Sequence, residues 1–297
     1  MTLDAWRAAG SEFHFDGRSI FCAGEGGGRA GEALLLIHGF PTSSYDWHRV
    51  WGELGERFRL VAPDMLGFGF SDKPADHDYR IAEQADLHEY LCDLLAIDRV
   101  HILAHDYGDT VTQELLARAL EGSCRFEIQS VCLLNGGLFP EAHRARLIQK
   151  LLAGPLGPLL SRLSRESSFA RNFAPVFGPE TQPTASEMHD YWRVVSHGGG
   201  QHIGHRLLSY LRERVENRDR WVGALEGAAA HGIPLRFVNG LLDPVSGGHM
   251  LTRYRALVPD PDWVALERIG HYPQVEDPAG VLRAYWAFLH RNELLPD

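Results

Sequence analysis

The sequence HILAHDYGDT, residues 101–110, decides the fold. It begins as a short apolar strand, turns at small residues and continues with the pattern of a helix. Asp106 stands at the apex of the turn, between Ala104 and Gly108. This small-x-nucleophile-x-small pattern is typical of a turn that presents a catalytic nucleophile, most often serine. An aspartate after a strand is also a common turn former or helix N-cap, so the rest of the chain decides between the two interpretations.

The composition is that of an ordinary globular protein. The chain has 297 residues, of which 44% are hydrophobic and 23% charged, and a formal net charge of -10. No general affinity for nucleic acid is expected from this charge. The four cysteines are widely spaced without a CxxC pair, as in reduced cytoplasmic proteins. No apolar run approaches membrane-spanning length, so we expect a cytoplasmic protein without a membrane anchor; the oligomeric state stays open.

Apolar strand patterns alternate with helical patterns over much of the chain. A hairpin is expected around Asp16 and Gly17, and the first helix after the hairpin over residues 47–57. Continuous apolar strands separated by amphipathic helices favour a parallel sheet that is covered on both faces. The expected strands of this sheet are residues 33–39, 58–64, 100–106, 128–136, 233–240 and 262–270.

The alternation stops after Gly137 and resumes near residue 225. Residues 138–224 contain helical patterns and Pro/Gly punctuation but no convincing strand. A helical block inserted between strands of one sheet is expected to cover an active site. We therefore predict a core of residues 1–137 and 225–297, and a helical cap of residues 138–224.

Two further patterns favour simple structural interpretations. A GxGxxG match at Gly26, Gly28 and Gly31 precedes a strand, whereas a dinucleotide site requires a helix there, so a loop is the better interpretation. The histidines of SHGGGQHIGH, residues 196–205, lack Cys or carboxylate partners at ligand spacing. No metal and no cofactor are expected.

Asp106, Asp243 and His271 occur in the order nucleophile, acid, histidine. Each follows a predicted strand, where open parallel sheets build their sites. Taken singly, each of these residues is more often a turn former or an ordinary histidine. Their joint occurrence in this order predicts a catalytic triad.

The charge of Asp106 determines which reaction suits it. A carboxyl group with an ordinary pKa of about 4 is ionised at neutral pH and needs no base to activate it. It can attack an sp³ carbon and form an alkyl-enzyme ester. His271, oriented by Asp243, would then deprotonate a water that attacks the ester carbonyl. The backbone N–H groups of Phe40 and Tyr107 are expected to form the oxyanion hole.

Several segments carry a family resemblance over nearly the whole chain. The chain resembles α/β-hydrolases with an aspartate nucleophile, the epoxide hydrolases and haloalkane dehalogenases, and is most similar to the mesoderm-specific transcript family. This resemblance implies an α/β-hydrolase fold: a mostly parallel eight-stranded sheet flanked by helices, with an inserted helical cap. The segments that carry it include LLLIHGFPTSSYDW (34–47), DMLGFGFSDKP (64–74), LAHDYGDTVTQELL (103–116), NGGLFPEAHR (135–144), APVFGP (174–179), RWVGAL (220–225) and HYPQVEDP (271–278).

The resemblance does not identify the substrate, so we compare the residues near the predicted nucleophile and in the predicted cap with those of the two enzyme families. Haloalkane dehalogenases generally place Asn or Trp side chains near the nucleophile to bind halide, whereas this chain has Phe40 and Tyr107. Epoxide hydrolases use cap tyrosines as acids; Tyr210 occupies about the place of the second, and Tyr191 is a weaker candidate. The first cap tyrosine has no counterpart here. Packing of Tyr210 against the core is the alternative interpretation of that residue.

These observations predict an epoxide hydrolase that converts a small apolar epoxide and water to a vicinal diol. Asp106 would be the nucleophile, and Phe40, Tyr107 and Tyr210 would contact the substrate. Haloalkane dehalogenation at the same aspartate is one alternative. A non-catalytic binding protein that retains the hydrolase fold is the other.

Overall fold

Strand β3 (Ala33–Ile37) is buried along its whole length because both faces of the sheet are covered. Its side chains alternate between two apolar clusters: Leu35 and Ile37 face one, and Leu34 and Leu36 face the other. A strand buried on both faces reads as a continuous apolar run, which is the pattern that predicted it. The computed structural model describes residues 1–25 and 32–295, so the GxGxxG match lies outside the described residues.

Within the described residues the sheet has eight strands, in the order β1-β2-β4-β3-β5-β6-β7-β8. The pairs β1–β2 and β2–β4 are antiparallel, and the remaining neighbours are parallel. The predicted fold class and the hairpin at Asp16 and Gly17 are confirmed. The other strands are β1 (Ser11–Phe15), β2 (Arg18–Glu25), β4 (Arg59–Pro63), β5 (Arg99–His105), β6 (Glu127–Leu134), β7 (Leu235–Gly240) and β8 (Asp262–Leu266).

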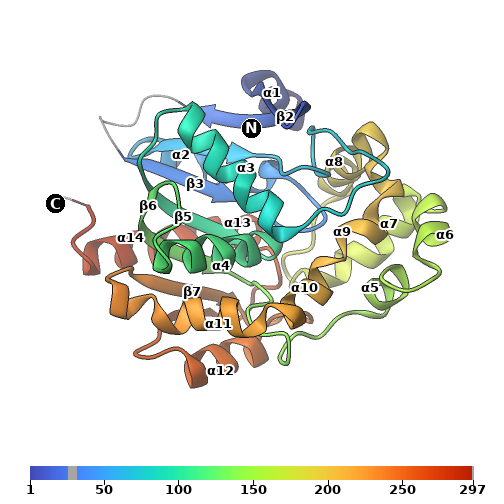
Figure 1. Ribbon diagram of the computed structural model, residues 1–297. Helices are drawn as coiled ribbons and strands as arrows, with labels where there is room; N and C mark the ends of the chain where they lie inside the picture. Colours follow the sequence, from blue (N-terminus) through green and yellow to red (C-terminus); the bar gives the residue numbers. More distant parts are fainter. Residues whose placement is uncertain (26–31, 296–297) are drawn as a thin grey trace.

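Helices cover both faces of the sheet (Figure 1). The first cluster packs against α3 (Ile81–Leu94), α4 (Tyr107–Leu120), α11 (Arg218–Gly227) and α12 (Gly248–Leu257). The second packs against α1 (Leu3–Ala9), α2 (Trp51–Gly55) and α14 (Pro278–Arg291). The helix expected over residues 47–57 is shorter than predicted, because the 3₁₀ turn η1 (Ser44–Trp47) precedes α2. The short helix α13 (Pro273–Glu276) follows the loop that carries His271.

Between β6 and β7 the chain forms only helices and loops, several of which stand away from the sheet at the right of Figure 1. The predicted boundary at residue 224 falls inside α11, which packs along α4. The helices before α11 are α5 (Leu147–Leu152), α6 (Gly157–Arg162), α7 (Glu166–Phe173), η2 (Ala174–Val176), α8 (Ala185–Ser196), η3 (His197–His202), α9 (Gly204–Leu207) and α10 (Tyr210–Glu216); η4 (Ala229–His231) follows it.

The turn between β5 and α4 has room only for glycine at its second small position. A Cβ atom added at Gly108 would lie 2.3 Å from the carbonyl oxygen of Ile37 and 2.7 Å from that of His38. Both obstacles are backbone atoms, which cannot move without disturbing β3. The close approach of α4 to β3 therefore depends on this glycine.

We expect Gly108→Ala to lower the free energy of unfolding by about 1–3 kcal/mol, as overpacking does in other buried sites. Urea denaturation followed by circular dichroism measures this effect. Gly52→Ala is the control, because a Cβ atom there meets nothing within 4 Å and alanine favours a helix by up to ~1 kcal/mol. Equal stability of the two variants would contradict the steric argument.

Candidate active site

Asp106 lies at a strained turn between β5 and α4. Its φ of 48° and ψ of -103° are values that a residue other than glycine seldom adopts. The side chain is 3% exposed. Sharp turns of this kind point a nucleophile out of the carboxyl end of the sheet. The local geometry therefore agrees with the prediction made from HILAHDYGDT.

The three predicted triad residues meet at the carboxyl ends of the strands. His271 Nδ1 lies 2.7 Å from Asp243 Oδ2, and His271 Nε2 lies 3.8 Å from Asp106 Oδ2. The backbone of His271 is fixed as well, since its N–H donates to Val176 of the cap and its carbonyl oxygen lies 2.7 Å from His105 Nε2. The imidazole thus bridges two carboxylates from different strands.

Asp243 is held by groups that sequence reasoning missed. Asn135 Nδ2 and Ser246 Oγ both donate to Asp243 Oδ2, at 3.0 and 2.6 Å. The backbone N–H of Val245 donates to the other oxygen at 2.7 Å. Burial alone would raise the pKa of Asp243, but the charge of His271 and these hydrogen bonds lower it. The position of Asn135, directly after β6, is the one signal in the sequence that could have identified it.

Sequence reasoning also missed Glu276, the last residue of α13, which follows the loop that carries His271. Its carboxylate accepts hydrogen bonds from the backbone N–H groups of Gly178, Gly270 and Tyr272, at 2.8 to 2.9 Å. Gly178 belongs to the predicted cap and the other two flank His271. Glu276 therefore joins the cap to the loop that carries the histidine.

One of the two predicted oxyanion donors contacts Asp106, the predicted nucleophile. The backbone N–H of Phe40 donates to Asp106 Oδ2 at 3.2 Å. Tyr107 is the first residue of α4, so its N–H belongs to the helix N-terminus, which favours negative charge. The Tyr107 side chain points elsewhere: its hydroxyl is buried and donates to the carbonyl oxygen of Tyr79 at 3.4 Å.

A buried arginine from the cap, Arg214, lies beside Asp106. Its Nη2 donates to the backbone oxygen of Asp106 at 3.2 Å and lies 3.9 Å from Oδ1 of the same residue. Its Nε donates to Thr110 Oγ1 at 2.7 Å. The segment HDYGDTV around Asp106 contains no arginine, and nothing in the pattern of α10 indicated that Arg214 reaches Asp106. This cation is a consequence of how the cap packs on the core.

The charges around Asp106 keep it ionised. Burial alone would raise its pKa, but His271 and the charge of Arg214 hold it well below its ordinary value. Burial alone would likewise lower the pKa of His271, but the charge of Asp243 and the nearby Asp106 raise it well above the ordinary value. Both shifts favour the pairing of an aspartate anion with a protonated histidine.

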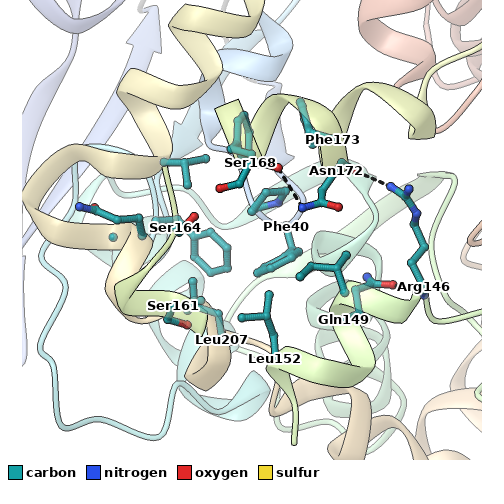
Figure 2. Close-up of a pocket in the computed structure, with 18 of the residues that line it drawn as sticks. Phe40, Arg146, Gln149, Leu152, Ser161, Ser164, Ser168, Asn172, Phe173 and Leu207 are labelled. Atoms are coloured by element: carbon teal, nitrogen blue, oxygen red, sulfur yellow. Dashed lines mark hydrogen bonds between the residues drawn. The ribbon is translucent and has the colours of Figure 1, made fainter. Parts of the chain in front are cut away.

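A cavity of about 290 Å³ lies over Asp106 and His271 and beneath the cap. Its lining is mostly apolar, and Phe40, Leu152, Phe173 and Leu207 border it in Figure 2. A smaller polar group occurs on the cap side, where Asn172 donates to the Ser168 carbonyl oxygen and Arg146 donates to that of Asn172. The space suits a mostly apolar small molecule.

The two predicted cap tyrosines are buried and neither lines this cavity. Tyr210, the first residue of α10, packs against the rings of Tyr107 and Phe40, with centroids 4.9 and 6.3 Å apart. Its hydroxyl is buried and has no hydrogen-bond partner among the described residues. Tyr191 packs with Phe173 at 5.2 Å in a separate apolar cluster. Of the three expected substrate contacts, Phe40 borders the cavity, whereas Tyr107 and Tyr210 do not line it.

The histidines of residues 196–205 do not converge on a site. His197 packs against Phe70, and His205 Nδ1 lies 3.1 Å from Ser161 Oγ. Within residues 1–25 and 32–295 no group of three or more His, Cys, Asp or Glu side chains is arranged to hold a metal ion.

Comparison with known proteins assigns the chain to a family. The α/β hydrolase fold family matches residues 32–278. The chain belongs to this family. It is 46% identical to the mesoderm-specific transcript protein of Mus musculus, over 97% of this chain and 88% of that protein. The resemblance noted in the sequence is thereby confirmed.

Solved structures with this fold include enzymes of two kinds. A loop variant of the haloalkane dehalogenase DbeA from Bradyrhizobium elkanii has a TM-score of 0.77 and 20% identity, covering 96% of this chain and 97% of that chain. The epoxide hydrolase CorEH has a TM-score of 0.74 and 21% identity, covering 95% and 98%. At such identities the likeness establishes the fold alone. In the described residues no helix has the length and apolar character needed to cross a membrane.

The pairing of Asp106 with His271 leads to a direct prediction. We expect Asp106→Asn to lower the pKa of His271, because the variant removes one of the two carboxylate charges that keep the imidazole protonated. NMR titration of the histidine ring resonances measures the shift. Asp219→Asn is the control, since the Asp219 side chain is 99% exposed and outside the site. An unchanged His271 pKa in Asp106→Asn would contradict the coupling.

Proposed function

We propose that the protein is an epoxide hydrolase that works through an ester of Asp106. The observation that carries this proposal is a buried aspartate at the strained turn between β5 and α4, 3.8 Å from His271 Nε2, with His271 in turn paired to Asp243. Attack of a carboxylate on an acyl carbon would give an anhydride, which makes ordinary ester hydrolysis a poor use of this residue. Attack on an sp³ carbon gives a stable ester that His271 can help to hydrolyse.

In the first step, an oxygen of Asp106 attacks one ring carbon of the epoxide. The new bond is the ester C–O bond, and the ring C–O bond on the attacked carbon breaks. The electron pair of that bond passes to the ring oxygen, which takes a proton from an acid in the cap and becomes a hydroxyl group. Arg214 and the N–H of Phe40 support this step by keeping Asp106 ionised and oriented.

In the second step, water attacks Cγ of the esterified Asp106. His271 Nε2 accepts a proton from that water, and negative charge develops on an oxygen of Asp106 that faces the Phe40 N–H. The ester C–O bond then breaks, and the departing alkoxide takes the proton from His271. The products are a vicinal diol and Asp106 with one oxygen from the water. The proton of the resting His271 returns to the cap acid after the first step, and the remaining hydrogen of the water passes from the new carboxyl group to His271, which restores the resting state.

The charge coupling supports the change of role that His271 requires. A protonated imidazole cannot serve as a base. Esterification neutralises Asp106 and so removes one of the charges that raise the pKa of His271. The histidine becomes a stronger candidate base after the first step, when the mechanism needs one.

Tyr210 remains our candidate for the acid of the first step. Its hydroxyl is buried and has no hydrogen-bond partner in the described part of the chain, so an alkoxide would be its first acceptor. Burial, with the charge of Asp106, raises the pKa of this hydroxyl, and Arg214 opposes the rise. Because Tyr210 does not line the cavity, this role requires the cap to rearrange when substrate binds. Tyr191 is the weaker second candidate.

Intact mass spectrometry of His271→Ala tests the nucleophile and the substrate class together. We expect incubation with pooled epoxides to leave an adduct equal to one whole epoxide on the peptide that carries Asp106. The ester persists because the base of the second step is missing. The control is the double variant Asp106→Asn/His271→Ala, which should stay unmodified.

The same experiment separates the alternatives. An adduct formed only from pooled haloalkanes, lacking the halogen, would move the assignment to dehalogenation. No adduct from either pool, together with an inactive wild type, would overturn the proposal and favour a non-catalytic binding protein.

Replacement of the cap tyrosine tests the acid. We expect Tyr210→Phe to lower kcat for an epoxide by about 100-fold or more, because general acids typically contribute about 10²- to 10⁴-fold. Tyr254→Phe is the matched control. The Tyr254 hydroxyl is also buried and has no hydrogen-bond partner among the described residues, but Tyr254 belongs to α12 and not to the predicted cap. Equal activity of the two variants would remove Tyr210 from the mechanism, and Tyr191→Phe would then be the next variant to measure.

A further inference from the structure

Five exposed leucines gather on one part of the cap. We call Leu147, Leu151, Leu156, Leu159 and Leu163 the leucine patch. They lie on α5, on α6 and beside α6, and their exposed fractions run from 40% to 72%. Of the other large apolar side chains that are exposed in the described chain, only Tyr90 and Leu94 share an element, α3. A cluster of exposed apolar side chains marks an interaction surface more often than isolated ones do.

Both helices of the patch are apolar on two faces. On α5, Ile148 and Leu152 line the cavity, while Leu147 and Leu151, four residues apart, are exposed. On α6, Leu160 lines the cavity and Leu159 is exposed. Core packing explains the inner faces but leaves the outer faces without a partner.

The patch is continuous with the candidate active site. Leu163 lines the cavity and is nevertheless 61% exposed, so it lies at an opening. Figure 2 shows Leu152 of α5 pointing toward the cavity that Phe40 borders. An apolar molecule held at the patch could therefore enter the cavity past Leu163.

The segment that carries the patch is rich in cations, although the protein as a whole is acidic. Residues 141–171 carry six Arg or Lys against two Glu, whereas the chain has a net charge of -10. Lys150, Arg162, Arg165 and Arg171 are exposed, and none forms an ion pair within the described residues. Exposed leucines among unpaired cations are the combination that binds the surface of an anionic bilayer.

We propose that the leucine patch docks on an anionic lipid bilayer and that the substrate enters the cavity from the membrane. The second half of this statement rests on the proposed function, and the first half does not. The leucines insert among the lipid chains, and the cations contact the headgroups. The opening at Leu163 then faces the bilayer, where an apolar electrophile is more concentrated than in water.

Cosedimentation of the full chain with vesicles tests the docking. We expect binding to phosphatidylcholine vesicles that contain one quarter phosphatidylglycerol, and weaker binding to pure phosphatidylcholine or at high salt. Leu156→Ser/Leu159→Ser should need at least about tenfold more lipid for half-maximal binding. Lys150→Glu/Arg162→Glu should show a similar loss on the anionic vesicles alone.

A matched variant controls for surface hydrophobicity. Leu94 and Val215 are 55% and 65% exposed, close to the 57% and 56% of Leu156 and Leu159. Leu94→Ser/Val215→Ser should bind vesicles like the wild type. Equal loss in both leucine variants, or no vesicle binding by the wild type, would overturn the docking proposal. A wild-type dimer that Leu156→Ser/Leu159→Ser converts to a monomer, without lipid binding, would show that a second copy covers the patch and would equally overturn it.

The substrate route has its own measurement. Turnover of a long-chain epoxide dissolved in the same vesicles should fall about tenfold in Leu156→Ser/Leu159→Ser, while turnover of water-dissolved styrene oxide stays unchanged. An equal fall for both substrates would overturn delivery from the membrane. If the wild type hydrolyses neither epoxide, the proposed function fails, and the cosedimentation result still decides the docking.

Discussion

The buried contact between Asp106 and His271 is the interaction on which the rest of the site depends. Two carboxylates, Asp106 and Asp243, face two cations, protonated His271 and Arg214, in a place with almost no access to water. Buried charges are tolerated only when they are paired, so each member requires the others. The set is balanced while Asp106 is an anion. Esterification of Asp106 would leave excess positive charge, and the group able to release a proton is His271.

The parts of this arrangement that the sequence predicted are those determined by local patterns. The strands that carry Asp106, Asp243 and His271 are continuous apolar runs, and the carboxyl ends of parallel strands meet at one edge of the sheet. These features follow from the residues of one element and its immediate neighbours, so the fold and the meeting of the triad could be anticipated without coordinates.

The parts that could not be predicted depend on how the cap packs on the core. Arg214 is one of several arginines in its segment, and its position beside Asp106 is decided by contacts between α10 and α4. Tyr210 is adjacent in the fold to Phe40 and Tyr107, yet its side chain is outside the cavity, which no spacing along α10 reveals. Glu276 is another case, because its three backbone donors come from two separate segments.

In the proposed function, the distribution of charge lets the exposed face of α5 and α6 bind the membrane while their inner face lines the cavity. An anionic surface repels a protein of net charge -10 as a whole, but it attracts the Arg and Lys residues of the segment that carries the leucine patch. The resulting torque turns the cap toward the membrane before any leucine inserts. The same orientation brings the opening at Leu163 against the lipid chains and directs the acidic remainder toward water. The same two short helices, α5 and α6, then serve both docking and substrate entry, because their exposed faces carry the leucine patch and their inner faces line the cavity.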